Sequence, residues 1–217
     1  MTPIDTEHIA SEQYQLKRSS TGLVEITPDN VARVEAMIAE NSRYNRSLKL
    51  NDTSSSKAGL ANLKRELDTL HNPSFQAVFN AMRAVNRENS TRLSDEELKE
   101  LANRLCVLSS SDILEYLEKP TFKLGPGEEK YFLVSYLKRK TTDGNRKGRQ
   151  NYPFATKFCH YACMNFFQGK IEADNFPIVD NVVKAVFPKY AKNIVKQNDF
   201  DDYETFVKNI DDVLNHY

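Results

Sequence analysis

The sequence predicts an all-α protein, and three observations support that prediction. Apolar residues recur at helical spacing in most segments after residue 27. Capping patterns precede several of these segments, and 7 glycines and 8 prolines are too few for the tight turns of an all-β fold. We expect a helical bundle of about 8–11 helices, forming one domain over 1–217 or two lobes, 27–119 and 126–217, around a cleft.

The N-terminal segment is polar and weakly patterned as far as residue 26, and Leu23–Ile26 is its one candidate strand. A helix is predicted to start at Thr27-Pro28-Asp29, because a capping hydroxyl precedes a proline whose missing N–H costs nothing there. Apolar residues then follow at helical spacing: Val31, Val34 and Ile38.

Two helices are predicted next, separated by Asn72-Pro73. The first covers about 57–70 and repeats leucine every three or four residues: Leu60, Leu63, Leu67 and Leu70. The second has an apolar face made of Phe75, Val78, Phe79, Met82 and Val85.

Two serine-rich patterns predict further helix starts. Ser94 followed by Glu97 is a capping box before Leu98, Leu101, Leu105 and Leu108. Ser109–Asp112 caps a segment with Ile113, Leu114 and Leu117. Gly125-Pro126-Gly127 predicts a turn, and residues 131–137 form an amphipathic segment after it.

The stretch 151–187 is the densest apolar part of the chain. It predicts a helix with Lys157 and His160, a loop, and a second helix opening at Pro177-Ile178-Val179-Asp180. The last helix, at about 200–215, begins with acidic residues, which suits the helix dipole.

Composition indicates a globular protein, with 40% hydrophobic and 28% charged residues. The net charge is zero, so binding to a polyanion depends on local clusters of charge. The sequence contains no apolar run of the roughly 20 residues that a membrane span needs, and its first residues do not have the pattern of a signal peptide. Three cysteines without framework spacing indicate a reducing compartment, and we expect a cytoplasmic location.

The cysteines are predicted to be structural. Cys159 and Cys163 share a helical face, but a zinc site needs about four ligands and the usual second pair is absent. Cys159 and His160 are adjacent on a helix and point in different directions, which is poor geometry for a thiolate–imidazole pair. Phosphate-binding glycine motifs are absent too, so the sequence predicts neither a metal nor a cofactor.

A basic run between the segments 131–137 and 151–187 is the candidate nucleic-acid contact. Its cations are Lys138, Arg139, Lys140, Arg146, Lys147 and Arg149. Clustered cations neutralise phosphates, and the alternative is a solvated surface loop.

Lys157 and Asp180 are the candidate chemical groups. The positive end of a helix dipole and partial burial both disfavour a charged lysine, and a neutral amine is a nucleophile for a sugar C1′. Asp180 is placed to stabilise a positively charged sugar and to help deprotonate the amine. The alternatives are a lysine extending to solvent and an aspartate that caps a helix.

The order basic turn, lysine at a helix start, apolar helix, loop, Pro-Ile-Val-Asp and apolar helix resembles the helix-hairpin-helix DNA glycosylase superfamily, nearest to its 8-oxoguanine branch. The match covers about 40 residues, with Asn151-Tyr152-Pro153-Phe154 in place of the Leu-Pro-Gly-x-Gly hairpin and Asn181-Val182 in place of Thr-His. The resemblance implies Lys157 as Schiff-base nucleophile and Asp180 as its partner.

In that interpretation the protein flips a modified base out of double-stranded DNA. The base would stack against Tyr152, Phe154, His160 or Phe176. Two alternatives stay open. One is a non-catalytic helical module that binds nucleic acid or protein, and the other is an interaction protein that docks through its acidic C-terminal helix.

Overall fold

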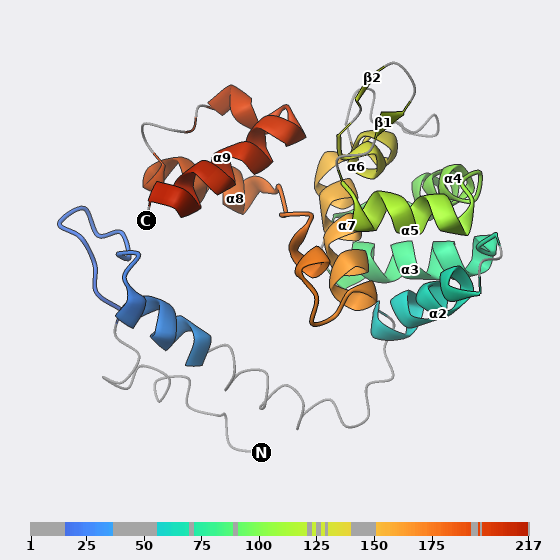
Figure 1. The fold of residues 1–217 in the computed structure, drawn as a ribbon, viewed down its shortest axis with the longest axis horizontal. Coiled ribbons are helices and arrows are strands. Elements are labelled where there is room, and N and C mark those ends of the chain that lie inside the picture. The colour runs from blue at the N-terminus through green and yellow to red at the C-terminus, as the bar shows by residue number, and fades with distance from the viewer. Residues whose placement is uncertain are drawn as a thin grey trace. The chain divides into compact units, whose positions relative to one another are not determined.

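The structure is a computed structural model that describes residues 16–36, 56–69, 72–88, 91–120, 123–124, 127–128, 130–139, 151–191, 195 and 197–216 (Figure 1). The chain divides into two compact units, with the boundary after residue 53. That boundary falls inside the first of the two lobes considered above, 27–119. The candidate site lies entirely in the second unit.

In the first unit a helix spans 28–36, and the predicted start is confirmed: the Thr27 hydroxyl accepts from the Asn30 N–H at 3.2 Å. The buried Asn30 side chain also accepts from the Lys17 N–H and donates to the carbonyls of Lys17 and Glu25. The candidate strand contributes one bridge, between Arg18 and Val24. Ile38 lies outside the described residues.

The second unit begins with a pair of helices, α2 (Ser56–Asp68) and α3 (Phe75–Glu88), which pack closely. A Cβ on Gly59 would stand 3.0 Å from the Asn80 carbonyl oxygen, so the absence of a side chain there permits this approach. The predicted apolar faces are buried except at the first residue of α3, Phe75, which is exposed. Leu70 lies outside the described residues.

Two capping boxes start the next helices as predicted. Ser94 and Glu97 cap α4 (Asp95–Leu105), and Ser109 and Asp112 cap α5 (Ser110–Glu118). In each box the serine hydroxyl accepts from the third backbone N–H of the helix, and the acid accepts from the serine N–H.

A short hairpin and a short helix follow. Strands β1 (Lys123–Leu124) and β2 (Gly127–Glu128) pair antiparallel, with Leu124 opposite Gly127. Helix α6 (Phe132–Leu137) begins after Tyr131, which has a left-handed φ of 57°. The ring of Tyr131 makes edge contacts with Phe176 and Tyr203, so packing holds this backbone conformation in place.

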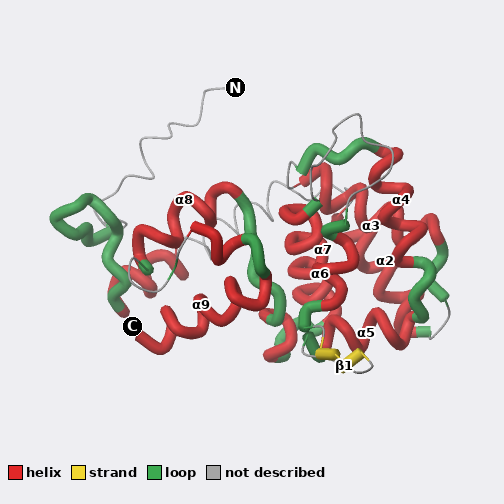
Figure 2. Tube along the Cα trace, turned by 90° about the horizontal axis from the view of Figure 1, so that it is seen from above, coloured by secondary structure: helices red, strands yellow, loops and turns green. Residues whose placement is uncertain are grey.

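Helix α7 (Tyr152–Phe166) is the centre of the second unit, with Pro153 in its first turn. It packs on α2, α3, α5 and α6, and Figure 2 shows it beside α6 and close to α3. Nine of its residues are buried, including both cysteines, which agrees with the prediction of packed thiols.

Beyond α7 the chain passes through η3 (Ile171–Asp174) to α8 (Asn181–Tyr190), η4 (Gln197–Phe200) and α9 (Tyr203–His216). The rings of Phe187, Phe200 and Phe206 join α8, η4 and α9. The predicted all-α class is confirmed. None of the described helices has the length and apolar character needed to cross a membrane.

Candidate functional site

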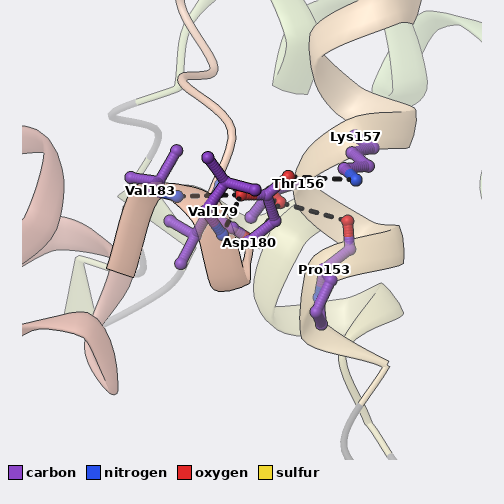
Figure 3. A network of polar contacts seen from close by, with 7 residues as sticks. Pro153, Thr156, Lys157, Val179, Asp180 and Val183 are labelled. Carbon is purple, nitrogen blue, oxygen red and sulfur yellow. Dashed lines mark hydrogen bonds and ion pairs between the residues drawn. The ribbon is translucent and has the colours of Figure 1, made fainter. Parts of the chain in front are cut away.

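The structure brings Lys157 and Asp180 together. Lys157 lies on the second turn of α7 and Asp180 lies at the start of α8. The Lys157 Nζ is 3.2 Å from Oδ2 of Asp180, and the two side chains are 13% and 24% exposed (Figure 3). The pair is therefore a charged contact shielded from bulk water but still accessible to solvent.

Asp180 is the N-cap of α8. Its backbone is extended, with φ −137° and ψ −177°, and its Oδ1 accepts from the N–H groups of Val182 and Val183 at 2.9 and 3.0 Å. Aspartate at this position satisfies N–H groups that have no partner within the helix. The capping role considered from the sequence is thus present, and it leaves Oδ2 for the lysine.

Segment 176–180 is tied to α7 beside the ion pair. The buried Thr156 Oγ1 accepts from the Val179 N–H at 3.2 Å, one residue before Asp180 (Figure 3). Nδ1 of His160 lies 2.9 Å from the Phe176 carbonyl, and because a carbonyl only accepts, this nitrogen is the donor. Consecutive turns of α7 therefore fix both ends of the segment.

A further contact to the same segment comes from the first residue of α9. The Tyr203 hydroxyl donates to the Pro177 carbonyl at 2.7 Å. With Thr156 and His160, this bond fixes the path of the chain into α8 without using Lys157. We call these three bonds the segment anchors.

The electrostatics of Asp180 follow from these contacts. Burial is the largest single influence and opposes ionisation, but the bonds from Val183, Lys157 and Val182 together outweigh it. They hold the pKa of the Asp180 carboxyl below its ordinary value, so the group is an anion at neutral pH.

The four residues predicted to line a base pocket lie around the same helix but in different environments. Phe154 and Phe176 are 1% and 0% exposed, and their rings pack on Phe158 and on Tyr131 and Tyr203. Tyr152 is also buried. His160 is half-buried, and it lies three residues after Lys157, on the same side of α7.

Two of the six cations predicted to bind nucleic acid, Lys138 and Arg139, are described, and Lys140, Arg146, Lys147 and Arg149 lie outside the described residues. The two ends of this basic segment are joined: the Asn151 N–H donates to the Lys138 carbonyl at 3.2 Å. The Arg139 carbonyl accepts from Arg104 at 2.9 Å. The described residues on either side of positions 140–150 therefore lie together at the N-terminal end of α7.

Two residues with contacts at or beside the pair, Thr156 and Lys184, are not predicted from the sequence. Thr156 is a hydroxyl residue in an otherwise apolar helical stretch, which is a signal for a buried polar contact. Lys184 follows Asp180 by four residues, so it lies one turn further along the same face of α8.

No group of three or more His, Cys, Asp or Glu residues suited to a metal ion occurs in the described part of the chain. Burial raises the pKa of the Cys159 thiol well above its ordinary value and also raises that of Cys163. Both therefore stay as protonated thiols and are poor nucleophiles.

Comparisons of the chain with protein-family models, with curated proteins and with solved structures find no match. The geometry of the described residues is therefore the basis on which a function can be assigned.

Proposed function

We propose that the protein acts on DNA at the C1′ atom of a deoxyribose, as a DNA glycosylase or abasic-site lyase with Lys157 as nucleophile and Asp180 as its partner. The observation that supports this proposal is the 3.2 Å contact between the two groups. They come from successive helices and lie 23 positions apart in the chain.

The pair has the parts that imine chemistry needs. An ammonium ion cannot attack carbon, and Oδ2 of Asp180 lies within proton-transfer distance of the Lys157 amine. As the carboxylate accepts a proton from the ammonium, the amine forms a bond to C1′ and the base leaves with the electrons of its glycosidic bond. Asp180 then passes that proton to the departing base. Opening of the sugar ring then gives an imine between Lys157 and C1′.

Asp180 is suited to stay in place during this reaction. A nucleophile must move towards its substrate, whereas a group that stabilises developing positive charge acts best when it is already oriented. The cap bonds of Asp180 and the three segment anchors do not involve Lys157. Asp180 therefore keeps its position when the lysine leaves it.

Base flipping remains part of the proposal, with altered roles for the aromatic residues. Phe154 and Phe176 have their ring faces in the core, so they support the site from behind. His160 is half-buried on the same side of α7 as Lys157, which makes it the member of the predicted set best placed to contact an extruded base.

DNA is the proposed partner because the sequence has six cations between α6 and α7, the helix that carries Lys157. Lys138, Arg139 and the basic segment that follows them begin and end next to the first turn of α7. Phosphate contacts from this segment would position the strand, while Lys157 meets the sugar.

The test is reductive trapping. Incubation with borohydride and duplexes that carry 8-oxoguanine or an abasic site is expected to give a covalent protein–DNA adduct. The adduct should disappear in Lys157→Gln and persist in the matched control Lys99→Gln, which changes an exposed lysine on α4. Failure of the wild-type protein to trap any such duplex would contradict the proposal.

A non-catalytic nucleic-acid-binding module is the second candidate. It is favoured by the observation that both oxygens of Asp180 already make structural contacts, one to the α8 backbone and one to Lys157. It predicts salt-sensitive DNA binding that weakens when Arg146, Lys147 and Arg149 are neutralised. In that case Lys157→Gln would leave binding unchanged and no adduct would form.

A further inference from the structure

Two lysines from different helices converge on the ring of Tyr152. The Nζ of Lys138, at the end of α6, lies 5.6 Å from the ring centroid, and the Nζ of Lys184, on α8, lies 5.7 Å from it. Both lysines are half-buried. An aromatic ring attracts cations, and both ammonium groups lie within reach of this ring.

The Tyr152 hydroxyl is buried and has no hydrogen-bond partner among the described residues. A buried polar atom without a partner costs free energy and calls for an explanation. Burial and the negative charges of Asp202 and Asp201 raise the pKa of this hydroxyl, so it keeps its proton and can donate a hydrogen bond.

This cluster adjoins the Lys157–Asp180 pair. The Lys184 N–H donates to the Asp180 carbonyl at 2.9 Å, which places Lys184 one turn beyond the cap. On the other side, the Lys138 carbonyl accepts from Asn151, the residue before Tyr152. The cluster therefore lies between the start of α8 and the joined ends of the basic segment.

The acidic residue Asp202, near the cluster, has a structural partner of its own. It accepts from the Thr205 N–H at 3.0 Å and from the Thr205 hydroxyl at 2.6 Å. The Thr205 hydroxyl is the largest influence that lowers the pKa of Asp202, and the charge of Lys138 also contributes. Asp202 thus balances part of the charge of Lys138 while its carboxylate stays engaged with Thr205.

We infer that Lys138, Tyr152 and Lys184 form a binding site for a phosphodiester group of DNA next to the sugar that Lys157 would attack. This inference rests on the proposed function, because it places the phosphate on the same strand. Two ammonium groups and a neutral O–H match an oxyanion with several acceptor atoms. On binding, each lysine exchanges its ring contact for a contact with the phosphate, and Tyr152 supplies a hydrogen bond.

Salt dependence of DNA binding tests the site directly. Binding of a fluorescent duplex with a tetrahydrofuran abasic analogue would be measured over a range of salt concentrations for Lys138→Gln, Lys184→Gln and the control Lys189→Gln. For duplex DNA, a plot of the logarithm of the binding constant against the logarithm of the salt concentration has a negative slope. The magnitude of that slope falls by roughly 0.9 for each phosphate that the protein no longer neutralises. We expect that change in the first two variants and an unchanged slope in Lys189→Gln, which removes an exposed lysine from the same helix.

Tyr152→Phe gives the second arm. It should weaken duplex binding several-fold at constant salt slope, and it should leave the urea midpoint equal or higher because it removes a buried hydroxyl without a partner. Unchanged slopes in both lysine variants, or unchanged affinity in Tyr152→Phe, would overturn the site. The site would also be overturned if these substitutions change the affinity for inorganic phosphate but leave the affinity for duplex DNA unchanged.

The binding assay and the trapping assay fail independently. The tetrahydrofuran analogue has no C1′ leaving group, so its binding does not require the lysine reaction. Altered slopes without a trapped adduct would support the phosphate site and contradict the proposed chemistry. An adduct at Lys157 with unaltered slopes would support the proposed chemistry and contradict the phosphate site.

Discussion

The N-caps of α4 and α8 both accept hydrogen bonds from first-turn N–H groups, but they differ in which parts of the chain they connect. Ser94 satisfies the first turn of α4, and its partner acid, Glu97, lies three residues away in the same helix. Asp180 satisfies the first turn of α8 with one oxygen and contacts Lys157 with the other. The first cap belongs to one helix, whereas the second joins two.

Under the proposed function, this difference separates a purely structural helix start from the one that would carry the reaction. A serine cap needs only its hydroxyl, and its removal affects a single helix end. The aspartate cap holds a charge against a lysine from a distant part of the chain, and the segment anchors of Thr156, His160 and Tyr203 fix its position. A cap that is reinforced in this way is a structural element suited to a reactive pair.

The largest expected difference comes from removing the two caps. Asp180→Ala should lower the free energy of unfolding by about 2–3 kcal/mol, because it deletes the α8 cap and removes the ionic contact of the partly buried Lys157. Ser94→Ala should cost about 1 kcal/mol. Urea unfolding monitored by circular dichroism measures the free energy of unfolding of both variants. Equal decreases would contradict the claim that the α8 cap stabilises more than its own helix end.

Thr156 provides a smaller test of the segment anchors. Thr156→Val keeps the shape of the side chain but leaves the Val179 N–H without its acceptor, and we expect a cost of about 1–2 kcal/mol. Thr156→Ser keeps the hydroxyl and should restore the wild-type rate of borohydride trapping. If Thr156→Val traps DNA at the wild-type rate, the anchor at Thr156 does not position Asp180.

The pH dependence of stability gives the smallest and most specific effect. Because the pKa of Asp180 is lowered in the folded protein, its ionised form stabilises the fold above the ordinary carboxyl pKa, and that contribution disappears as pH falls through the folded pKa. The stability difference between wild type and Asp180→Asn should therefore be largest near neutral pH. A difference that does not change on acidification would contradict the ionic contact.

Much of the fold could be predicted because its signals are local. Capping boxes at Ser94 and Ser109 involve residues three positions apart, and the leucines of α2 reveal its buried face by spacing alone. The start at Thr27 follows from the same rules. These features need no knowledge of distant contacts.

Parts of the site could not be predicted in this way. Chemical type and a resemblance single out Lys157 and Asp180, but their contact depends on how α8 docks on α7. The partners of Thr156 and His160 are backbone atoms of segment 176–180, and backbone atoms carry no sequence signal. The sequence does not indicate that Lys184 lies near the Tyr152 ring, which Lys138 also approaches.

The most direct measurement is the location of the covalent bond. The borohydride-reduced adduct with abasic DNA would be digested and the modified lysine identified by mass spectrometry. We predict modification at Lys157. Modification at Lys138, Lys184 or another lysine instead, or no adduct at all, would contradict the assignment of Lys157 as the nucleophile.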